Sequence, residues 1–322
     1  MDKSEGPRFL MSKDPIGHHR LPAVIIAQFS PDKQPELRTS FVSVRRRGKS
    51  VSRGRAEKLT RENRIYDFAK SFYGGVDPRI EAINEGGLEK LWHVYENNLD
   101  HLLKLLGKPS ETHSEVKVDK EIMQTMIPYL AGVIVRGGDF DDRQPTLYPN
   151  LMDDHTNVQR VLAWQKAQAS IFHSKITYVR PPPGEEFILS DTGYCIVFKK
   201  NDPERGVVYF PVTPNLAFSV TRSGNPSYVL DDNPYGTFYI EEGVLRDITT
   251  ITYSTILYSW RELYASSSTR LKCIQYPVDR LPVPLSPHQV LNNTAHPREE
   301  VAFWQNTVMA MQLKGLIRIL DI

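Results

Sequence analysis

Basic side chains concentrated in one segment give this sequence its plainest chemistry, the binding of phosphate groups. Residues 45–64 contain nine basic and two acidic residues, so the segment carries a formal charge of +7. The whole chain carries +2, which leaves −5 for all other residues. The basic residues are Arg45, Arg46, Arg47, Lys49, Arg53, Arg55, Lys58, Arg61 and Arg64. Such side chains can neutralise several phosphates of a nucleic acid, with an affinity that falls as salt rises.

The first six of these residues, from Arg45 to Arg55, are the candidate binding residues, and two interpretations of them are open. In one, they bind nucleic acid or an acidic partner protein. In the other, they pair with the protein's own acidic remainder, for example with the residues between Asp139 and Asp154. Aromatic residues are sparse between the basic positions, so the pattern does not indicate that bases stack on the protein.

Acidic side chains gather in a second segment, where their types suit a hard divalent cation. The sequence there offers Asp139, Asp141, Asp142, Asp153, Asp154 and His155. Asp139 and Asp141 are the candidate metal ligands of this segment. Their spacing lacks the glycine and the closing glutamate of an EF-hand loop. The pattern favours a solvated loop in which Asp153 or Asp154 caps the following helix, and a divalent metal site is the alternative.

Several common catalytic motifs are missing from the sequence. It contains no Gly-x-Ser-x-Gly elbow, P-loop, dinucleotide-binding fingerprint or His-Glu-x-x-His motif, which argues against the commonest hydrolases, nucleotide-binding proteins and zinc proteases. Its two cysteines, Cys195 and Cys273, lack the spacing of a zinc site or a disulfide framework. No signal peptide and no apolar run of about 18 to 20 residues is evident. We therefore expect a cytoplasmic protein that does not enter a membrane.

A set of short motifs runs in order along the chain from about Gly17 to Tyr264. They are His19-Arg20-Leu21-Pro22 followed by Phe29-Ser30, an arginine at Arg136, Phe187-Ile188-Leu189-Ser190-Asp191, and Phe210-Pro211-Val212-Thr213-Pro214. In order and spacing they resemble the uncharacterised, mainly bacterial domain-of-unknown-function family 4238. The chain departs from the family at Leu189, where threonine is usual, and at Gly193, where proline is usual. Because the family has no settled activity, the resemblance implies candidate residues and no reaction.

The resemblance singles out His19, Arg136 and Asp191 as candidate catalytic residues of one polar site. Their side-chain types can act as a base, a phosphate clamp and a metal ligand, with a divalent metal ion on Asp191. That set suits a phosphate-ester hydrolase, or a nuclease-like effector of a bacterial conflict or defence system. In the alternative interpretation, the side chains of His19 and Asp191 cap or fasten loops, and Arg136 pairs with a carboxylate near its helix end. The chain would then be a non-catalytic module that binds nucleic acid or protein through the basic hairpin.

The elements that must position these residues predict an α+β fold. Two β-type runs between Phe41 and Val51 flank Gly48, which can supply a left-handed turn residue, so we expect an N-terminal β-hairpin. Apolar residues at helical spacing predict central helices over 88–106, 119–136 and from about 156, the last with Leu162 and Ala169 on its buried face. Short β-rich pieces separated by Pro- and Gly-containing turns predict an antiparallel sheet over 176–240, followed by a helix over 244–264.

Composition shifts divide the chain into three parts. Residues 1–18 are polar and contain two prolines and two glycines, which is typical of a flexible lead-in. Residues 19–265 contain the motifs and form the expected core domain. Residues 266–322 comprise a proline-rich irregular wrap and a C-terminal helix that we expect to begin near residue 297.

Overall fold

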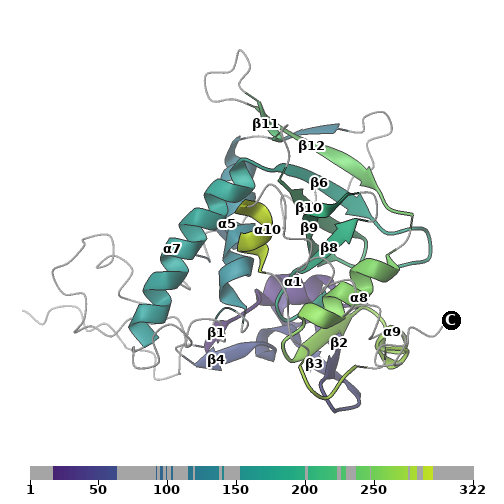
Figure 1. The fold of residues 1–322 in the computed structure, drawn as a ribbon. Helices are drawn as coiled ribbons and strands as arrows, with labels where there is room; N and C mark the ends of the chain where they lie inside the picture. Colours follow the sequence, from purple (N-terminus) through teal and green to yellow (C-terminus); the bar gives the residue numbers. More distant parts are fainter. Residues whose placement is uncertain are drawn as a thin grey trace, which may run out of the picture.

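The computed structural model describes residues 17–63, 115–118, 120–137, 153–199, 202–222, 226–229, 237–246, 248–274, 276–280 and 286–292, together with positions 92, 95, 96, 99, 103 and 140. Helices and sheets both contribute to this part of the chain, which confirms the α+β class (Figure 1). A larger and a smaller sheet lie on either side of helix α1 (Ala23–Gln28), which contacts a strand of each.

The larger sheet has seven described strands, with the order β11-β12-β6-β10-β9-β8 and β5 beside β12. All its described pairings are antiparallel, as expected, except that β12 runs parallel to β6. Residues 206–212 of β9 and 216–220 of β10 are buried almost without a break, so both faces of these strands are covered. The strands are β5 (Glu115–Val118), β6 (Lys175–Arg180), β8 (Cys195–Lys199), β9 (Asp202–Thr213), β10 (Leu216–Thr221), β11 (Tyr228–Val229) and β12 (Thr237–Val244).

The smaller sheet has the order β3-β2-β13-β7 and contains the expected hairpin. Strands β2 (Phe41–Arg46) and β3 (Val51–Arg55) pair antiparallel, and β13 (Glu262–Ala265) joins β2 to β7 (Leu189–Ser190). Gly48 has a φ of 66°, the left-handed conformation that the hairpin turn requires. The hairpin is therefore confirmed, and it brings the start of the basic segment beside the end of the β-rich section.

A two-stranded ladder extends from this region. Strand β1 (Gly17–His19) pairs antiparallel with β4 (Arg61–Asn63), with His19 opposite Arg61. A short 3-10 turn, η2 (Ala56–Lys58), connects β3 to β4, and a second, η1 (Leu37–Thr39), precedes β2. Residues 51–63 thus form two strands with a 3-10 turn between them.

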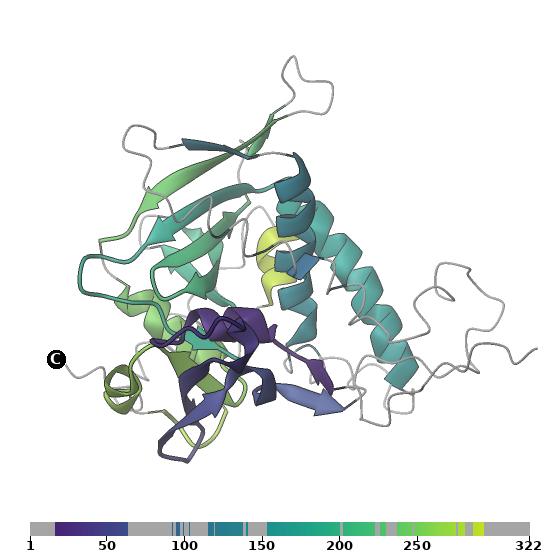
Figure 2. The ribbon, with the colours of Figure 1, turned by 180° about the vertical axis from the view of Figure 1, so that it is seen from behind.

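Two long helices lie side by side along one flank of the larger sheet, as both views show (Figures 1 and 2). They are α5 (Lys120–Arg136) and α7 (Asp153–Phe172). The indole Nε1 of Trp164 donates to the Pro128 carbonyl at 2.9 Å, which ties α7 to the middle of α5. Helix α8 (Thr249–Tyr258) packs on β8, and α10 (Pro287–Asn292) packs on β9 and α7. Within the described residues, no helix is both long and apolar enough to cross a membrane.

The structure corrects two of the expected helices. The helix expected over 244–264 is wrong at both ends, because Val244 ends β12 and residues 262–265 form β13 between β2 and β7. Hydrogen bonding to strands on both sides overrides the local helical pattern there. In α7, Leu162 and Ala169 are exposed, and the buried face instead carries Trp164, Ala167 and Ile171.

Two further expectations lie partly or wholly outside the described residues. Of the helix expected over 88–106, residues Trp92, Leu99 and Leu103 are helical and buried. The helix expected after residue 297 lies outside them. Two helices that the sequence did not predict stand in the described part of the last 57 residues: α9 (Ser268–Lys272), whose N-cap Ser267 accepts from the Thr269 N–H, and α10.

Candidate anion-binding site

The carboxylate of Asp191 holds the turn between α8 and β13 in place. Asp191 directly follows β7, and its Oδ1 accepts the backbone N–H of Trp260 at 2.8 Å. Its Oδ2 accepts the N–H of Arg261 at 2.7 Å and that of Glu262 at 3.1 Å. The hydroxyl of Ser259 lies 3.3 Å from Oδ1. Each carboxylate oxygen therefore has two donors, which fills the acceptor positions of an ionised carboxylate.

The surroundings of Asp191 set its proton affinity. The side chain is 5% exposed, and burial raises the pKa of this carboxyl to about 6. The value of about 6 also includes the nearby charge of Glu262, which raises the pKa, and the three backbone N–H groups of residues 260–262, which lower it. Asp191 thus carries its charge at neutral pH and can lose it in mildly acidic solution.

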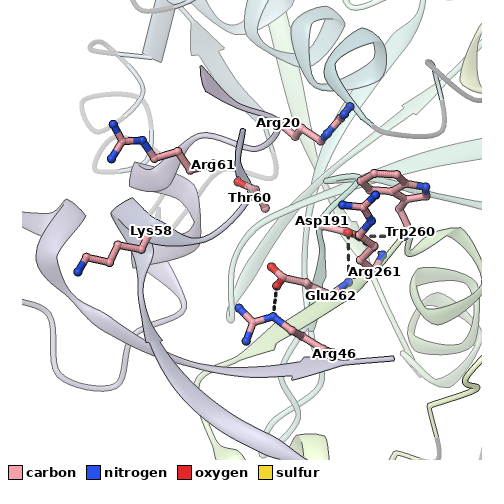
Figure 3. Close-up of a pocket in the computed structure, with 9 residues that line it drawn as sticks. All are labelled: Arg20, Arg46, Lys58, Thr60, Arg61, Asp191, Trp260, Arg261 and Glu262. Carbon is pink, nitrogen blue, oxygen red and sulfur yellow. Dashed lines mark hydrogen bonds and ion pairs between the residues drawn. The ribbon is translucent and has the colours of Figure 1, made fainter. Parts of the chain in front are cut away.

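The turn that Asp191 holds forms one wall of a cavity of about 190 Å³ (Figure 3). The other walls come from the residue after β1, the end of β2 and the stretch from η2 to β4. Five cationic side chains and two carboxylates line it, which gives the lining a formal charge of +3. The lining residues are Arg20, Arg46, Lys58, Thr60, Arg61, Asp191, Trp260, Arg261 and Glu262.

Trp260 orders two of the guanidinium groups of this basic pocket. The Arg261 guanidinium carbon lies 3.4 Å from the indole ring centre, and that of Arg20 lies 4.8 Å from it. Both distances are within the range of cation–π attraction. Trp260 therefore keeps two like charges close to the same cavity.

Glu262 is engaged with protein groups. Its Oε1 lies 2.5 Å from Nε of Arg46, and its Oε2 accepts the Tyr264 hydroxyl at 2.5 Å. Glu262 therefore offsets Arg46. The other cationic residues of the lining are Lys58, Arg61 and Arg261, all exposed, and the more buried Arg20. The pocket is strongly cationic, and it suits an anion.

The six candidate binding residues of the basic segment separate into different environments. Arg46 alone of the six lines the pocket. Arg45 donates to the Leu271 carbonyl at 2.8 Å. Arg47 donates to the carbonyls of Ser259 and Trp260 at 2.6 and 3.0 Å. The structure therefore uses these two arginines to join the hairpin to the rest of the protein.

The other three candidates lie toward solvent. Arg53 is 57% exposed and lies 3.5 Å from Asp32. Arg55 pairs with Glu57 at 2.9 Å, within the basic segment itself. Lys49 is exposed near the hairpin tip. The side chains of the acidic residues between Asp139 and Asp154, named as alternative partners, lie outside the described residues, and so does Arg64.

The three candidate catalytic residues do not share one described site. Arg136 is buried in the last turn of α5, where it forms an ion pair with Glu96 and its guanidinium carbon lies 4.7 Å from the Trp92 ring centre. It does not line the pocket around Asp191. His19 is described by its backbone, which pairs with Arg61 and brings the next residue, Arg20, to the pocket. The sequence analysis gave the pairing of Arg136 with a carboxylate as the alternative to a catalytic role, and the structure shows this pairing.

Metal ligation was expected at Asp191 and, as an alternative, at Asp139 and Asp141. The last two lie outside the described residues. The oxygens of Asp191 accept from backbone N–H groups, and these would have to be displaced for a metal ion to bind. In the part of the chain that the structure describes, no three His, Cys, Asp or Glu side chains are grouped so that they could hold a metal ion.

Sequence reasoning missed five residues of the pocket, namely Arg20, Thr60, Trp260, Arg261 and Glu262. Arg20 stands inside the His-x-x-Pro motif, and that position was the only signal for it. Trp260 and Arg261 fall in a segment to which the pattern assigned a helix. Their adjacency is a weak signal, because an aromatic next to an arginine is common on helix surfaces as well.

The chain has no match among protein-family models, curated proteins or solved structures. The resemblance to family 4238 therefore stays a prediction, and the geometry of the pocket is the basis for a function.

Proposed function

We propose that this protein is a binding module for a phosphate-bearing ligand, and that the ligand enters the basic pocket. One observation supports this most strongly. Five cationic side chains from three separate stretches of the chain, around residues 20, 46–61 and 261, line one cavity of about 190 Å³. Two carboxylates in the same lining offset part of this charge, and an anion in the cavity would offset the remaining formal charge of +3. A ligand that stabilises the arrangement binds the folded protein preferentially.

Phosphate is the anion that this lining fits best. Four of the five cations are arginines, whose planar guanidinium groups present paired donors that match the oxygens of phosphate. Lys58 adds a point charge, and Thr60 lies in the same wall with its hydroxyl donating to the Leu21 carbonyl at 3.0 Å. A carboxylate ligand would offer fewer acceptor oxygens and a smaller charge to the same donors.

Binding without catalysis is favoured over the hydrolase that the sequence also suggested. The two carboxylates of the pocket are engaged, Asp191 with backbone N–H groups and Glu262 with Arg46 and a tyrosine hydroxyl. A general base needs a lone pair that points to the proton it removes. Within the described residues, neither pocket carboxylate is arranged to activate water. We therefore propose a recognition role, with nucleic acid as one source of the phosphate.

The salt dependence of binding tests this proposal. The full chain is titrated with a fluorescein-labelled, 5′-phosphorylated single-stranded oligonucleotide at several salt concentrations, and fluorescence anisotropy is measured. We expect the affinity to fall as salt rises, and Arg261→Glu to weaken binding about tenfold or more because an attractive charge becomes repulsive. Absence of binding at low salt, or an affinity indifferent to Arg261→Glu, would overturn the proposal.

A further inference from the structure

We infer that the pocket takes a terminal phosphate, a phosphomonoester group, and not the internal phosphodiesters of a nucleic-acid strand. This inference rests on the proposed function and specifies its ligand. Three features of the described residues support it. They are the distribution of the cations of the basic segment, the small volume of the cavity, and the contacts of Trp260 with two arginines.

Three cations of the segment, Arg46, Lys58 and Arg61, line the cavity, and the head groups of Lys58 and Arg61 point away from Asp191 (Figure 3). A strand of nucleic acid carries one charge about every 3.4 Å, so recognition of its backbone calls for cations spaced along a surface. Arg45 and Arg47, next to Arg46 in sequence, are committed to backbone carbonyls. Arg53 and Arg55 have acidic neighbours at 3.5 and 2.9 Å. Arg46 has an acidic neighbour as well, Glu262, and it lines the cavity together with Lys58 and Arg61.

The cavity is small compared with sites that enclose a whole ligand. Sites that enclose a drug-sized ligand measure about 300 to 1,000 Å³, and this one measures about 190 Å³. A phosphate within a chain has a substituent on two oxygens, and both substituents would have to leave the cavity. A terminal phosphate has one substituent and three free oxygens, so it can enter end-on and meet donors from several walls.

The charge of the phosphate group also favours a monoester over a diester. A phosphomonoester carries about −1.5 to −2 at neutral pH, whereas each diester of a strand carries −1. The lining has a formal charge of +3, so the monoester neutralises more of it with a single group. The pocket therefore discriminates between the two chemistries by charge as well as by access.

Trp260 contributes by positioning guanidinium groups. Its ring already contacts Arg261 at 3.4 Å and Arg20 at 4.8 Å, so the aromatic surface in the pocket serves arginines. Recognition then centres on the phosphate, and the group attached to it remains outside. A small phosphorylated metabolite and the phosphorylated end of a strand share this chemistry.

Matched ligands separate these cases. The full chain is titrated with one short single-stranded oligonucleotide that carries either a 5′ phosphate or a 5′ hydroxyl, and ribose 5-phosphate is added as a competitor. We expect the phosphorylated strand to bind about tenfold more tightly or better, since it adds charge-assisted hydrogen bonds. Competition by ribose 5-phosphate would identify any accessible monoester as the ligand, and its absence would identify a strand end.

Two other outcomes contradict the inference in distinguishable ways. Equal, salt-dependent binding of both oligonucleotides, weakened alike by Arg261→Glu, would leave phosphate binding in place and overturn the preference for a terminal group. If neither oligonucleotide nor ribose 5-phosphate binds, the proposed function fails together with the inference. Arg53→Glu serves as the control for changes in total charge, because Arg53 does not line the pocket.

Discussion

The carboxylate of Asp191 accepts the backbone N–H of Arg261 at 2.7 Å, so a buried acid sets the position of a cation in the pocket. The acid and the cation are 70 residues apart in sequence. Asp191 also accepts the N–H groups on either side, those of Trp260 and Glu262. We therefore regard Asp191 as a positioning residue. This role predicts that replacing Asp191 changes the phosphate affinity in the direction opposite to that expected from its charge.

Asp191→Ala should weaken phosphate binding, by about tenfold, although it removes a negative charge from a cationic pocket. Simple electrostatics predicts the opposite, because the anion would lose a repulsive neighbour. The positioning role predicts weaker binding, because the turn at residues 260–262 loses its three acceptor contacts. Anisotropy titration of the folded variant decides between the two. Tighter binding by Asp191→Ala, or by Asp191→Asn, would show that the turn does not depend on this carboxylate.

The same residue should make stability depend on pH in mildly acidic solution. Burial raises the pKa of Asp191 to about 6 from an ordinary 3.8, so between about pH 4 and pH 6 the folded protein binds more protons than the unfolded chain. The free energy of unfolding should therefore fall as pH rises through this window, by up to about 3 kcal/mol from this group. Urea unfolding of the protein and of Asp191→Ala isolates the contribution. Parallel pH profiles for the two would contradict it.

Arg47 should be needed for stability more than for binding. Its guanidinium donates to the carbonyls of Ser259, Trp260, Pro277 and Asp279 and lies 4.5 Å from the Tyr276 ring centre. Arg47→Ala should lower the free energy of unfolding by about 2 to 4 kcal/mol, because these carbonyls lose their donor. Arg53→Ala, at an exposed position, should change it by less than about 0.5 kcal/mol. Similar losses of unfolding free energy in both variants would show that Arg47 contributes no more to stability than the exposed Arg53.

The buried pair of Arg136 and Glu96 should behave as part of the core. Removing one partner leaves the other charged and buried, so Arg136→Met should cost about 3 to 5 kcal/mol. The double variant Arg136→Met, Glu96→Leu should cost less than the sum of the two single changes. Phosphate affinity, measured on the folded double variant, should be unchanged. A loss of affinity without a loss of stability would instead connect Arg136 with the site.

The hairpin and most strands could be predicted from the sequence because their signals are local. Gly48 between two β-type runs predicts the turn, and its φ of 66° agrees. The segment around Trp260 could not be predicted, because its conformation depends on pairing with β2 and on the carboxylate of Asp191. The sequence shows the cluster of basic residues. It does not show which of them line the pocket and which donate to backbone carbonyls. Whether an arginine meets a carbonyl or a cavity depends on residues more than 200 positions away, as Arg47 and Ser259 illustrate.

One comparison tests the central claim most directly, since it changes equal charge at two places in the same basic segment. Lys58→Glu with Arg61→Glu reverses two cations of the pocket, and Arg53→Glu with Arg55→Glu reverses two outside it. All four positions lie at the surface or near it, and circular dichroism checks that both double variants fold. Binding of the 5′-phosphorylated oligonucleotide should fall by about a hundredfold in the pocket variant and little in the other. Equal losses in both would contradict a pocket and indicate a diffuse basic surface.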